Sequence, residues 1–394
     1  MKGLLLATAV GAVMASAAAA ETIKIGIELG FTGPIESLTP AMAAGAETAI
    51  KEINASGKLL GGATVEPVRA DSTCVDAAAA TAAAERLVTG EGVKAIMGAD
   101  CSGVTGAVLQ NVAVPNGIVM ISPSATSPAL STVEDNGLFF RTAPSDARQG
   151  EVMADIILDR GIKSVAVTYT NNDYGKGLAD SFKSAFEAKG GSVTIVAAHE
   201  DGKADYSAEV AALASAGGDA LVVAGYADQG GAGIIQAALD TGAFETFVLP
   251  DGMVSESLTD RFGTDIDGSF GQNPGTDSPG AAMFAEIAKA EGFDGTSPYA
   301  GESYDAAALI LLAMQAAGSD DPAKFKDKVM DVANAPGEKI MPGELGKALD
   351  ILASGGDIDY VGATAVELIG GGEAAGSYRE FEVKGGKFVT VGYR

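Results

Sequence analysis

Short apolar stretches alternate with alanine-rich amphipathic stretches from Glu21 onward, and this alternation restricts the possible fold more than any other feature of the chain. Strands that alternate with helices are typical of βαβ units, which build a mostly parallel sheet covered by helices on both faces. In the first half we expect strands over residues 23–29, 63–70, 93–97 and 117–121, and helices that begin near Pro40 and cover residues 75–89 and 103–112.

The same alternation then begins again. We expect strands over residues 164–168, 192–196, 220–224 and 246–249, with helices over residues 174–189, 206–216 and 229–240. In both halves the third strand runs into a glycine, Gly98 or Gly225, before a turn of small residues. A repeat of this size predicts two domains of one architecture, and a chance similarity between two α/β halves is the alternative.

Beyond Asp251 we expect helices over residues 281–291, 297–317, 322–333 and 342–353, then strands over residues 364–369 and 379–391. A helix-rich stretch and a strand-rich tail do not both extend the second domain easily. We therefore expect the chain to cross back near Pro274 and to return near Gly355. This gives a first lobe of residues 21–143 and 275–355, a second lobe of residues 144–274 and 356–394, and a hinge made of several crossings.

Residues 1–20 have the features of an export signal. Lys2 supplies the positive start, residues 4–17 form a short apolar run, and Ala18 to Ala20 supply the small-residue cleavage pattern. The run is shorter than the ~20 residues that a membrane-spanning helix needs, which disfavours a membrane anchor. No cysteine follows it, which disfavours a lipid anchor. We therefore expect a mature protein that is soluble and located in the periplasm.

The charge and the scarcity of histidine exclude several kinds of function. The chain has 52 acidic and 26 basic residues, a formal net charge of -26. Nucleic acids and anionic membranes are bound by clustered Lys and Arg, so neither is an expected partner. His199 is the only histidine, which rules out a multi-histidine metal site and leaves one candidate base for a nucleophile. We expect no metal, no cofactor and no catalysis.

Export also changes what the two cysteines, Cys74 and Cys101, indicate. In an oxidising compartment a lone pair of cysteines favours a disulfide. The chain-entropy model gives such a bridge about 3.5 kcal/mol of stability. A catalytic cysteine is the alternative, but neither residue has a basic neighbour in the sequence that would lower its pKa.

Known motifs of phosphate binding and of hydrolases are missing, and the informative residues follow the predicted strands. No P-loop, no G-x-G-x-x-G after the first strand and no G-x-S-x-G elbow occurs. In the first half, Ser102 and the segment 122–126 follow strands three and four, where ligands of parallel sheets collect. Hydroxyls and free backbone N–H groups there suit a small anion such as a carboxylate. Helix capping by Ser102 and Thr126 is the alternative.

The second half places residues of another kind at the equivalent positions. Tyr226 follows strand three, Asp251 follows strand four, and Tyr174 begins the first helix. A carboxylate flanked by aromatic rings suits an ammonium ion, through charge and cation–π contact. The alternatives are a solvated acid in an Asp-Gly turn for Asp251 and packing at the rim for the two tyrosines.

Together, five segments resemble the periplasmic leucine/isoleucine/valine-binding protein family, the type I solute receptors of ABC importers. The similarity covers nearly the whole mature chain, is loose after Gly318, and depends on the order and spacing of the segments. They are Cys74 with Cys101, GIVMISPSATSP over residues 117–128, NDYGKGL over residues 172–178, Gly225-Tyr226 and Pro250-Asp251-Gly252.

The resemblance implies two doubly wound parallel-sheet lobes joined by a three-crossover hinge, with the ligand held in the cleft and sealed in by closure. It implies a disulfide between Cys74 and Cys101. It places the ligand α-carboxylate at Ser102 and Thr126. The turn of residues 123–126, which includes Ala125, would accept from the α-ammonium through the carbonyl of Ser124.

The resemblance also implies that Asp251 is the acidic partner of the ammonium, with Tyr174, Tyr226 and Tyr299 as its aromatic neighbours. Two positions depart from the family pattern. Leucine-type receptors carry Glu where this chain has Asp251, and an aromatic residue where it has Leu38 or a neighbour. The α-amino-acid frame is therefore better supported than the branched side chain.

We therefore expect a monomeric, non-catalytic receptor that delivers a small zwitterion, an amino acid of the branched-chain type, to the permease of an ABC importer in the inner membrane. Receptors of the same fold for urea, short amides or aromatic carboxylates are alternatives. A ligand sensor for a membrane kinase would share the same pocket. A hydrolase would have to use His199, which is predicted at a strand end on the surface of the second domain.

Overall fold

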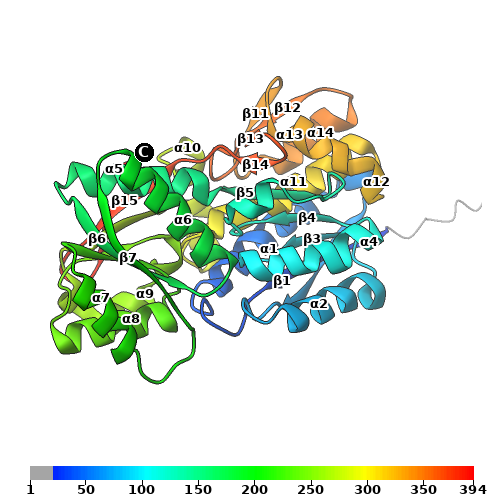
Figure 1. Cartoon of the computed structure of the whole chain (residues 1–394). Coiled ribbons are helices and arrows are strands. Elements are labelled where there is room, and N and C mark those ends of the chain that lie inside the picture. Colours follow the sequence, from blue (N-terminus) through cyan, green and yellow to red (C-terminus); the bar gives the residue numbers. More distant parts are fainter. Residues whose placement is uncertain (1–20) are drawn as a thin grey trace, which may run out of the picture.

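The computed structural model describes residues 21–394, which form two α/β lobes, each built on a seven-stranded sheet (Figure 1). The export signal predicted for residues 1–20 lies outside the described residues. No helix in the described part combines the length and apolar character needed to cross a membrane.

The first sheet has the strand order β13-β14-β5-β4-β3-β1-β2, in which only β13 runs antiparallel to its neighbour. Its strands are β1 (Thr22–Leu29), β2 (Thr64–Asp71), β3 (Ala95–Gly98), β4 (Val119–Ser122), β5 (Phe139–Pro144), β13 (Leu368–Ile369) and β14 (Glu373–Ala374). Its helices are α1 (Thr39–Ser56), α2 (Ala77–Glu85), α3 (Ser102–Val108), α4 (Val114–Asn116), α10 (Pro279–Glu291), α11 (Ala300–Ala317), α12 (Pro322–Phe325), α13 (Val329–Ala333) and α14 (Leu345–Ala353), with a small parallel pair of β11 (Glu338–Ile340) and β12 (Ile358–Tyr360) beside them.

The second sheet has the order β16-β15-β10-β9-β8-β6-β7, in which β15 and β16 are antiparallel to their neighbours. Its strands are β6 (Ser164–Thr170), β7 (Ser192–His199), β8 (Ala220–Ala224), β9 (Phe247–Leu249), β10 (Phe270–Pro274), β15 (Tyr378–Val383) and β16 (Phe388–Tyr393). Its helices are α5 (Asp146–Asp159), α6 (Asp173–Ala188), α7 (Ser207–Ala216), α8 (Gly230–Thr241) and α9 (Glu256–Phe262).

The two sheets repeat one topology, which confirms the prediction of two domains of one architecture. The order β2-β1-β3-β4-β5 in the first sheet corresponds to β7-β6-β8-β9-β10 in the second. In both lobes the first strand lies inside the sheet and the second at its edge, as in doubly wound folds. The loops that follow the central strands therefore lie together, at the carboxyl ends of the parallel strands of each sheet.

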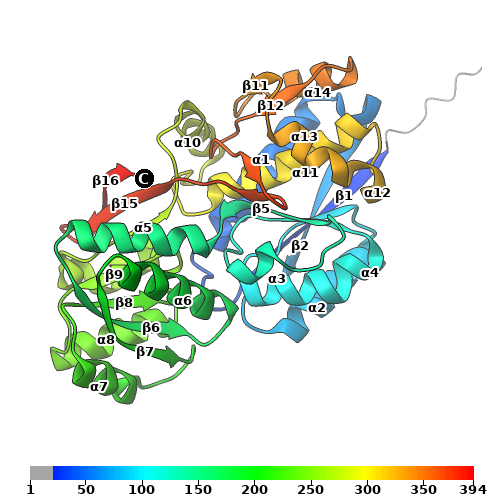
Figure 2. The same ribbon diagram turned by 45° about the horizontal axis from the view of Figure 1, so that its top comes forward.

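The chain passes between the lobes three times, and the last passage differs from our expectation (Figure 2). The first two passages follow β5 at Pro144 and β10 at Pro274. We expected the third near Gly355, which is wrong, because β14 pairs with β5 and keeps the chain with the first sheet as far as Ala374. The strands β13 and β14 have two residues each, too few to give a recognisable alternation of side chains.

Among the strands that were not predicted, β5 and β10 are interrupted by polar residues. The strand β5, with sequence FFRTAP, is fully buried and includes Arg141. The strand β10, with sequence FGQNP, is buried as well and includes Gln272 and Asn273. Both end in proline, which a central strand rarely contains. These are the strands from which the chain leaves one lobe for the other.

The core of the first lobe is organised around α11. Sixteen of its 18 residues are buried, and its middle, residues 306–314, is apolar on all sides, as expected for a core helix. It packs on α1 so closely that a Cβ added to Gly45 would lie 2.2 Å from the backbone oxygen of Ala300. This contact fixes the start of α11, and with it Tyr299, against the first sheet.

His199 is buried at the end of β7, where its Nδ1 lies 2.8 Å from the hydroxyl oxygen of Thr168. Burial lowers the pKa of the imidazole to about 4, against a smaller opposing effect of Glu209. The folded state therefore prefers the neutral ring. Its contribution to stability is complete above the unfolded pKa of about 6.5 and is lost as the pH falls from there to about 4.

We predict that lowering the pH from 8 to 5 leaves the imidazole signal of His199 unshifted in proton NMR, because the folded ring stays neutral. The assignment is simple, since the chain has one histidine. By linkage, the neutral ring makes the folded state about 2 kcal/mol less stable at pH 5 than a nontitrating residue would. His199→Gln should remove that part of the pH dependence in urea denaturation. A ring that titrates near pH 6.5 in the folded protein would contradict the prediction.

Candidate functional site

The first lobe contributes hydroxyl groups from the segments that follow β3 and β4. Ser102 begins α3, and its Oγ accepts a hydrogen bond from the backbone N–H of Ser127 at 3.0 Å. Ser124 lies in the turn after β4, and its Oγ donates to the backbone carbonyl of Asp100 at 3.0 Å. Since β3 and β4 are parallel neighbours, their carboxyl ends lie at the same edge and bring the two serines together.

A buried guanidinium holds the turn after β4 in place from behind. Arg141 of β5 donates through Nη1 to the backbone carbonyls of Ala125 and Ser127, both at 2.9 Å. Its Nη2 forms an ion pair with Glu373 of β14 at 2.6 Å. The planar, many-donor guanidinium suits this task, because several acceptors are satisfied by one rigid group.

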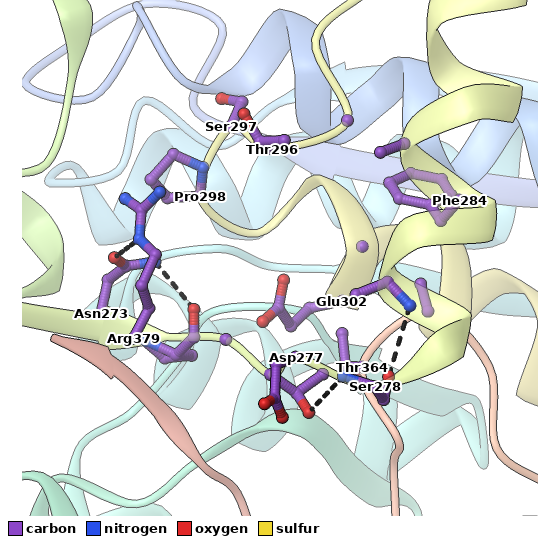
Figure 3. A pocket seen from close by; sticks show the side chains of 18 of the residues that line it. Asn273, Asp277, Ser278, Phe284, Thr296, Ser297, Pro298, Glu302, Thr364 and Arg379 are labelled. Carbon is purple, nitrogen blue, oxygen red and sulfur yellow. Dashed lines mark hydrogen bonds between the residues drawn. The ribbon is translucent and has the colours of Figure 1, made fainter. Parts of the chain in front are cut away.

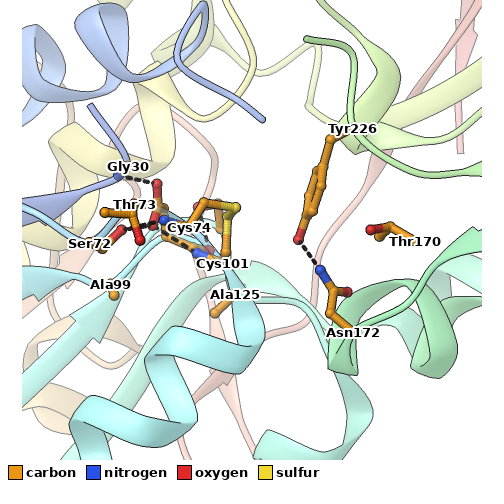
Figure 4. Close-up of a disulfide and its surroundings, with 12 residues drawn as sticks. Gly30, Ser72, Thr73, Cys74, Ala99, Cys101, Ala125, Thr170, Asn172 and Tyr226 are labelled. Atoms are coloured by element: carbon orange, nitrogen blue, oxygen red, sulfur yellow. Dashed lines mark hydrogen bonds between the residues drawn. A yellow bond between two sulfur atoms is a disulfide. The ribbon is translucent and has the colours of Figure 1, made fainter. Parts of the chain in front are cut away.

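Gly30 and Ser72 lie beside the disulfide (Figure 4), and Asp100 joins the three strand ends there. Its Oδ2 accepts from the backbone N–H of Gly30 at 2.6 Å, and its Oδ1 accepts from Ser72 Oγ at 2.8 Å and from the N–H of Cys101 at 2.9 Å. Cys101 is bonded to Cys74, with 5.1 Å between their Cα atoms, which confirms the predicted disulfide. The loops after β1, β2 and β3 are thus fixed to one another.

The second lobe contributes an acid and two stacked aromatic rings. Asp251 follows β9, and its Oδ1 accepts from the hydroxyl of Tyr174 and from Nε2 of Gln149, both at 2.7 Å. The ring of Tyr174 stacks on that of Tyr226, with centroids 5.2 Å apart. Asp251, Tyr174 and Tyr226 are all buried. The two tyrosines therefore lie inside the site, and the alternative that they pack at its rim is wrong.

Groups from both lobes meet across the cleft. The hydroxyl of Tyr299, at the start of α11 in the first lobe, donates to Oδ2 of Asp251. In the loop after β1, Ser37 donates its backbone N–H to Asp228 Oδ2 at 2.9 Å, and its Oγ lies 2.8 Å from Oγ of Ser255. The lobes are therefore in contact over the site, and the arrangement is closed.

These side chains enclose a small cavity that brings seven of the nine predicted ligand-binding residues together. Its volume is about 20 Å³, the space of one or two water molecules, so a larger ligand requires the lobes to separate. The predicted residues that line it are Leu38, Ser102, Ser124, Tyr174, Tyr226, Asp251 and Tyr299.

The other two predicted residues lie behind the cavity wall. Ala125 is fully buried and directs its carbonyl toward Arg141. The carbonyl of Thr126 accepts from the backbone N–H of Asp146 at 2.8 Å. Burial raises the pKa of the Asp146 carboxyl, and the hydroxyl of Thr126 opposes this rise. The structure therefore places both Ala125 and Thr126 in support of the turn, outside the cavity lining.

Four residues of the site were not predicted. Ile35, Asp100 and Gly252 line the cavity, and Gln149 donates to Asp251. Asp100 ends the loop after the third strand, so the reasoning that selected Ser102 could have selected it too. Gln149 lies on α5, a helix that was not predicted although Ser145 caps its start, because the strand β5 before it was not recognised.

The electrostatics of the cavity favour a cation. Its lining includes Asp100 and Asp251 and, within the described part of the chain, no lysine, arginine or histidine. Burial raises the pKa of Asp251 above its usual value, although the hydrogen bonds from Tyr299, Tyr174 and Gln149 oppose this. Burial and the charge of Asp251 raise the pKa of Tyr174 and Tyr299, so both hydroxyls remain donors.

The arrangement can hold an amine against the acid of the second lobe and an anion against the hydroxyls of the first. His199 does not line this cavity, so the one histidine of the chain does not face Ser102 or Ser124. Across residues 21–394, no three His, Cys, Asp or Glu side chains are grouped in a way that could hold a metal ion.

Comparison with known proteins identifies the family. Residues 22–344 match the sequence model described as periplasmic binding protein. The Leu/Ile/Val-binding protein homolog 3 of Brucella melitensis is 34% identical over 317 residues, which cover 78% of this chain and 82% of the relative. The chain belongs to the leucine/isoleucine/valine-binding protein family. The leucine-, isoleucine-, valine-, threonine- and alanine-binding protein of Pseudomonas aeruginosa is 30% identical over 327 residues, which cover 82% of this chain and 86% of the relative.

Solved structures share the fold of this family member. A leucine-binding protein from Thermotoga maritima has a TM-score of 0.79 at 25% identity, covering 94% of this chain and 98% of the other. A solute-binding protein of Rhodopseudomonas palustris, solved with benzoate, has a TM-score of 0.76 at 21% identity, covering 94% and 96%. The predicted type I periplasmic binding fold is confirmed, and the protein is a substrate-binding protein and not an enzyme.

We predict that replacing both cysteines, in Cys74→Ala with Cys101→Ala, lowers the free energy of unfolding by about 3.5 kcal/mol, because the unfolded chain regains the freedom of the loop between them. Urea denaturation of the oxidised wild type and of the double variant measures the difference. The wild type in reducing agent serves as a matched control. Equal midpoints for all three samples would contradict the prediction.

Proposed function

We propose that this family member is a periplasmic receptor for an α-amino acid of the branched-chain type, which it delivers to an ABC importer. The observation that carries the proposal is the buried carboxyl group of Asp251, which sits among tyrosine hydroxyls in a cavity whose lining includes no basic side chain. A ligand ammonium placed there would supply the missing positive charge. Breaking such a buried pair by removing one partner costs about 3–5 kcal/mol.

The two ends of the ligand would bind different lobes. Its α-carboxylate would accept from the hydroxyl of Ser102, which lines the cavity, and from that of Thr126, which lies behind the cavity wall in the described structure. Its α-ammonium would donate to Asp251 and to the carbonyl of Ser124, against the stacked rings of Tyr174 and Tyr226. A zwitterion held in this way crosses the cleft, so binding favours the closed arrangement.

The ligand side chain would lie against Leu38 and Ile35, which both line the cavity and are buried. Two aliphatic residues at the mouth of the first lobe suit a short aliphatic side chain. The names of the relatives in Brucella melitensis and Pseudomonas aeruginosa point to the same class.

Closure would be the signal that the importer recognises. A ligand shifts the balance between open and closed forms only as far as it binds the closed form better. Bridging both lobes through Asp251 and Ser102 provides that difference. The permease in the inner membrane would then engage a closed monomer, which reaches the periplasm by means of a cleavable signal at residues 1–20.

Aromatic carboxylates are a weaker choice of ligand, although a receptor of Rhodopseudomonas palustris with this fold was solved with benzoate. A ligand with a single negative charge would meet Asp100 and Asp251 without a lysine or arginine in the lining. Urea and short amides lack the charge that Asp251 would balance. A sensor for a membrane kinase would use the same pocket and the same ligand.

We predict that Asp251→Asn weakens the binding of L-leucine at least 100-fold in isothermal titration calorimetry. Asparagine keeps the shape of the side chain and removes its charge, which corresponds to a loss of about 3 kcal/mol or more. The leucine analogue without its amine, 4-methylpentanoate, should lose little. Asp265→Asn, at an exposed position of the same lobe, is the control. Unchanged affinity for leucine in Asp251→Asn would refute the role of Asp251.

We also predict that a thermal-shift screen over amino acids, amides and aromatic acids gives its largest shifts with leucine, isoleucine and valine. A ligand that binds only the folded state stabilises it by about 2.7 kcal/mol at a hundredfold excess over Kd. Larger shifts with urea, amides or benzoates than with any amino acid would overturn the proposed ligand class.

A further inference from the structure

A second and much larger cavity lies at the hinge (Figure 3). It shares Tyr299 with the ligand cavity. Its volume is about 460 Å³, within the usual range of small-molecule pockets, about 300–1,000 Å³. Both lobes and the second crossover line it. The residues that matter below are Asn273, Phe284, Thr296, Glu302, Thr364 and Arg379.

Within residues 21–394, Arg379 of β15 is the only basic residue that lines this cavity. Its Nε donates to Oδ1 of Asn273 at 3.1 Å, and within residues 21–394 no carboxylate lies close enough to form an ion pair with it. Burial lowers the pKa of the guanidinium, which remains charged at neutral pH. The two Nη groups are therefore donors in a half-buried place without an acidic partner from the described chain.

Glu302, on the first turn of α11, directs its carboxyl group into the same space (Figure 3). The residue is 5% exposed. Burial raises the pKa of this carboxyl to about 8, and Asp305 adds to the effect, while its own backbone N–H and Arg379 oppose it. At neutral pH Glu302 therefore carries its proton and is a hydrogen-bond donor.

We propose that this cavity is a second binding site, for a small organic carboxylate with an apolar body. The carboxylate would pair with the Nη groups of Arg379 and accept from Glu302, and the apolar body would lie against the ring of Phe284. A guanidinium forms paired hydrogen bonds with a carboxylate. A cation is disfavoured next to Arg379, which would repel it, and beside Glu302, which is neutral; Asp277 is a further acid in the described lining.

Occupation of this site would be coupled to closure of the cleft, because the lining joins both lobes. Phe284 and Glu302 belong to the first lobe, Arg379 to the second, and Asn273 lies beside the crossover at Pro274. A ligand that fits the hinge in its closed shape stabilises that shape. By reciprocity, the cleft ligand then raises the affinity for the hinge ligand by the same factor.

Calorimetry with benzoate at pH 7 tests the site, and benzamide is the neutral control probe. We expect saturable benzoate binding that is at least tenfold weaker in Arg379→Gln and unchanged in Arg148→Gln, a substitution at an exposed arginine of the same lobe. Benzamide should bind weakly to all of them.

The pH dependence gives a second test that does not need Arg379→Gln to fold. Above pH 8 Glu302 ionises and repels the carboxylate, so affinity should fall about tenfold by pH 9, one unit above the pKa. Glu302→Gln keeps a donor and should bind benzoate at pH 7 without that fall. The charged and titratable groups that share a cavity lining with Glu302 are Asp277, Glu367, Arg379 and Tyr393. Asp305, on the same helix, also acts on its pKa.

Three results would overturn the proposal: no saturable binding of benzoate, equal affinity for benzoate and benzamide, or benzoate binding that Ser102→Ala weakens and Arg379→Gln does not. The last would place benzoate in the cleft. The coupling rests on the proposed function and has its own test, in which saturating leucine should strengthen benzoate binding severalfold. If leucine does not bind at all, the benzoate results still decide whether the hinge site exists.

Discussion

The closed structure depends on how one buried carboxyl group is satisfied. Asp251 accepts hydrogen bonds from Gln149 and Tyr174 of its own lobe and from Tyr299 of the other. Burying an acid without partners costs several kcal/mol, so a closed cleft without these donors would be unstable. The donors are neutral, however, and they leave the charge unbalanced. The lobes can therefore close with the protein groups alone, but a bound cation would make the closed form more stable. A ligand drives closure only through such a gain in the stability of the closed form over the open form.

The two lobes use one topology for opposite chemistry. In each lobe, the loops after the central parallel strands meet at the carboxyl ends of those strands, so the fold determines where the residues on these loops lie. In the first lobe those loops carry Ser102 and Ser124, held from behind by Arg141 and Asp100. In the second they carry an acid and two aromatic rings. The two similar lobes thereby place a surface lined with hydroxyl groups opposite an acidic surface. This arrangement suits a zwitterion, which has a carboxylate at one end and an ammonium at the other.

The sequence was sufficient to predict the residues that lie directly after regular strands. Ser102, Tyr226 and Asp251 all follow apolar runs with clear ends, and the structure brings them into one cavity. Gln149 could not be predicted, since the strand that leads to its helix contains a buried arginine and ends in proline. The third crossing was misplaced because β14 is only two residues long and depends on pairing with β5, a contact between residues far apart in the chain.

Tyr299 lies between the hinge cavity and the ligand cavity and lines both of them. It precedes α11 with a φ of 66°, a left-handed conformation that is unfavourable for a bulky residue and persists only where the surroundings hold it. The packing of α11 on α1 supplies that constraint from one side. In this conformation the hydroxyl of Tyr299 donates to Asp251. The same residue forms part of the wall of the hinge cavity. A shift of the helix start would change both places at once, so the residue offers a short physical path between the hinge and the cleft.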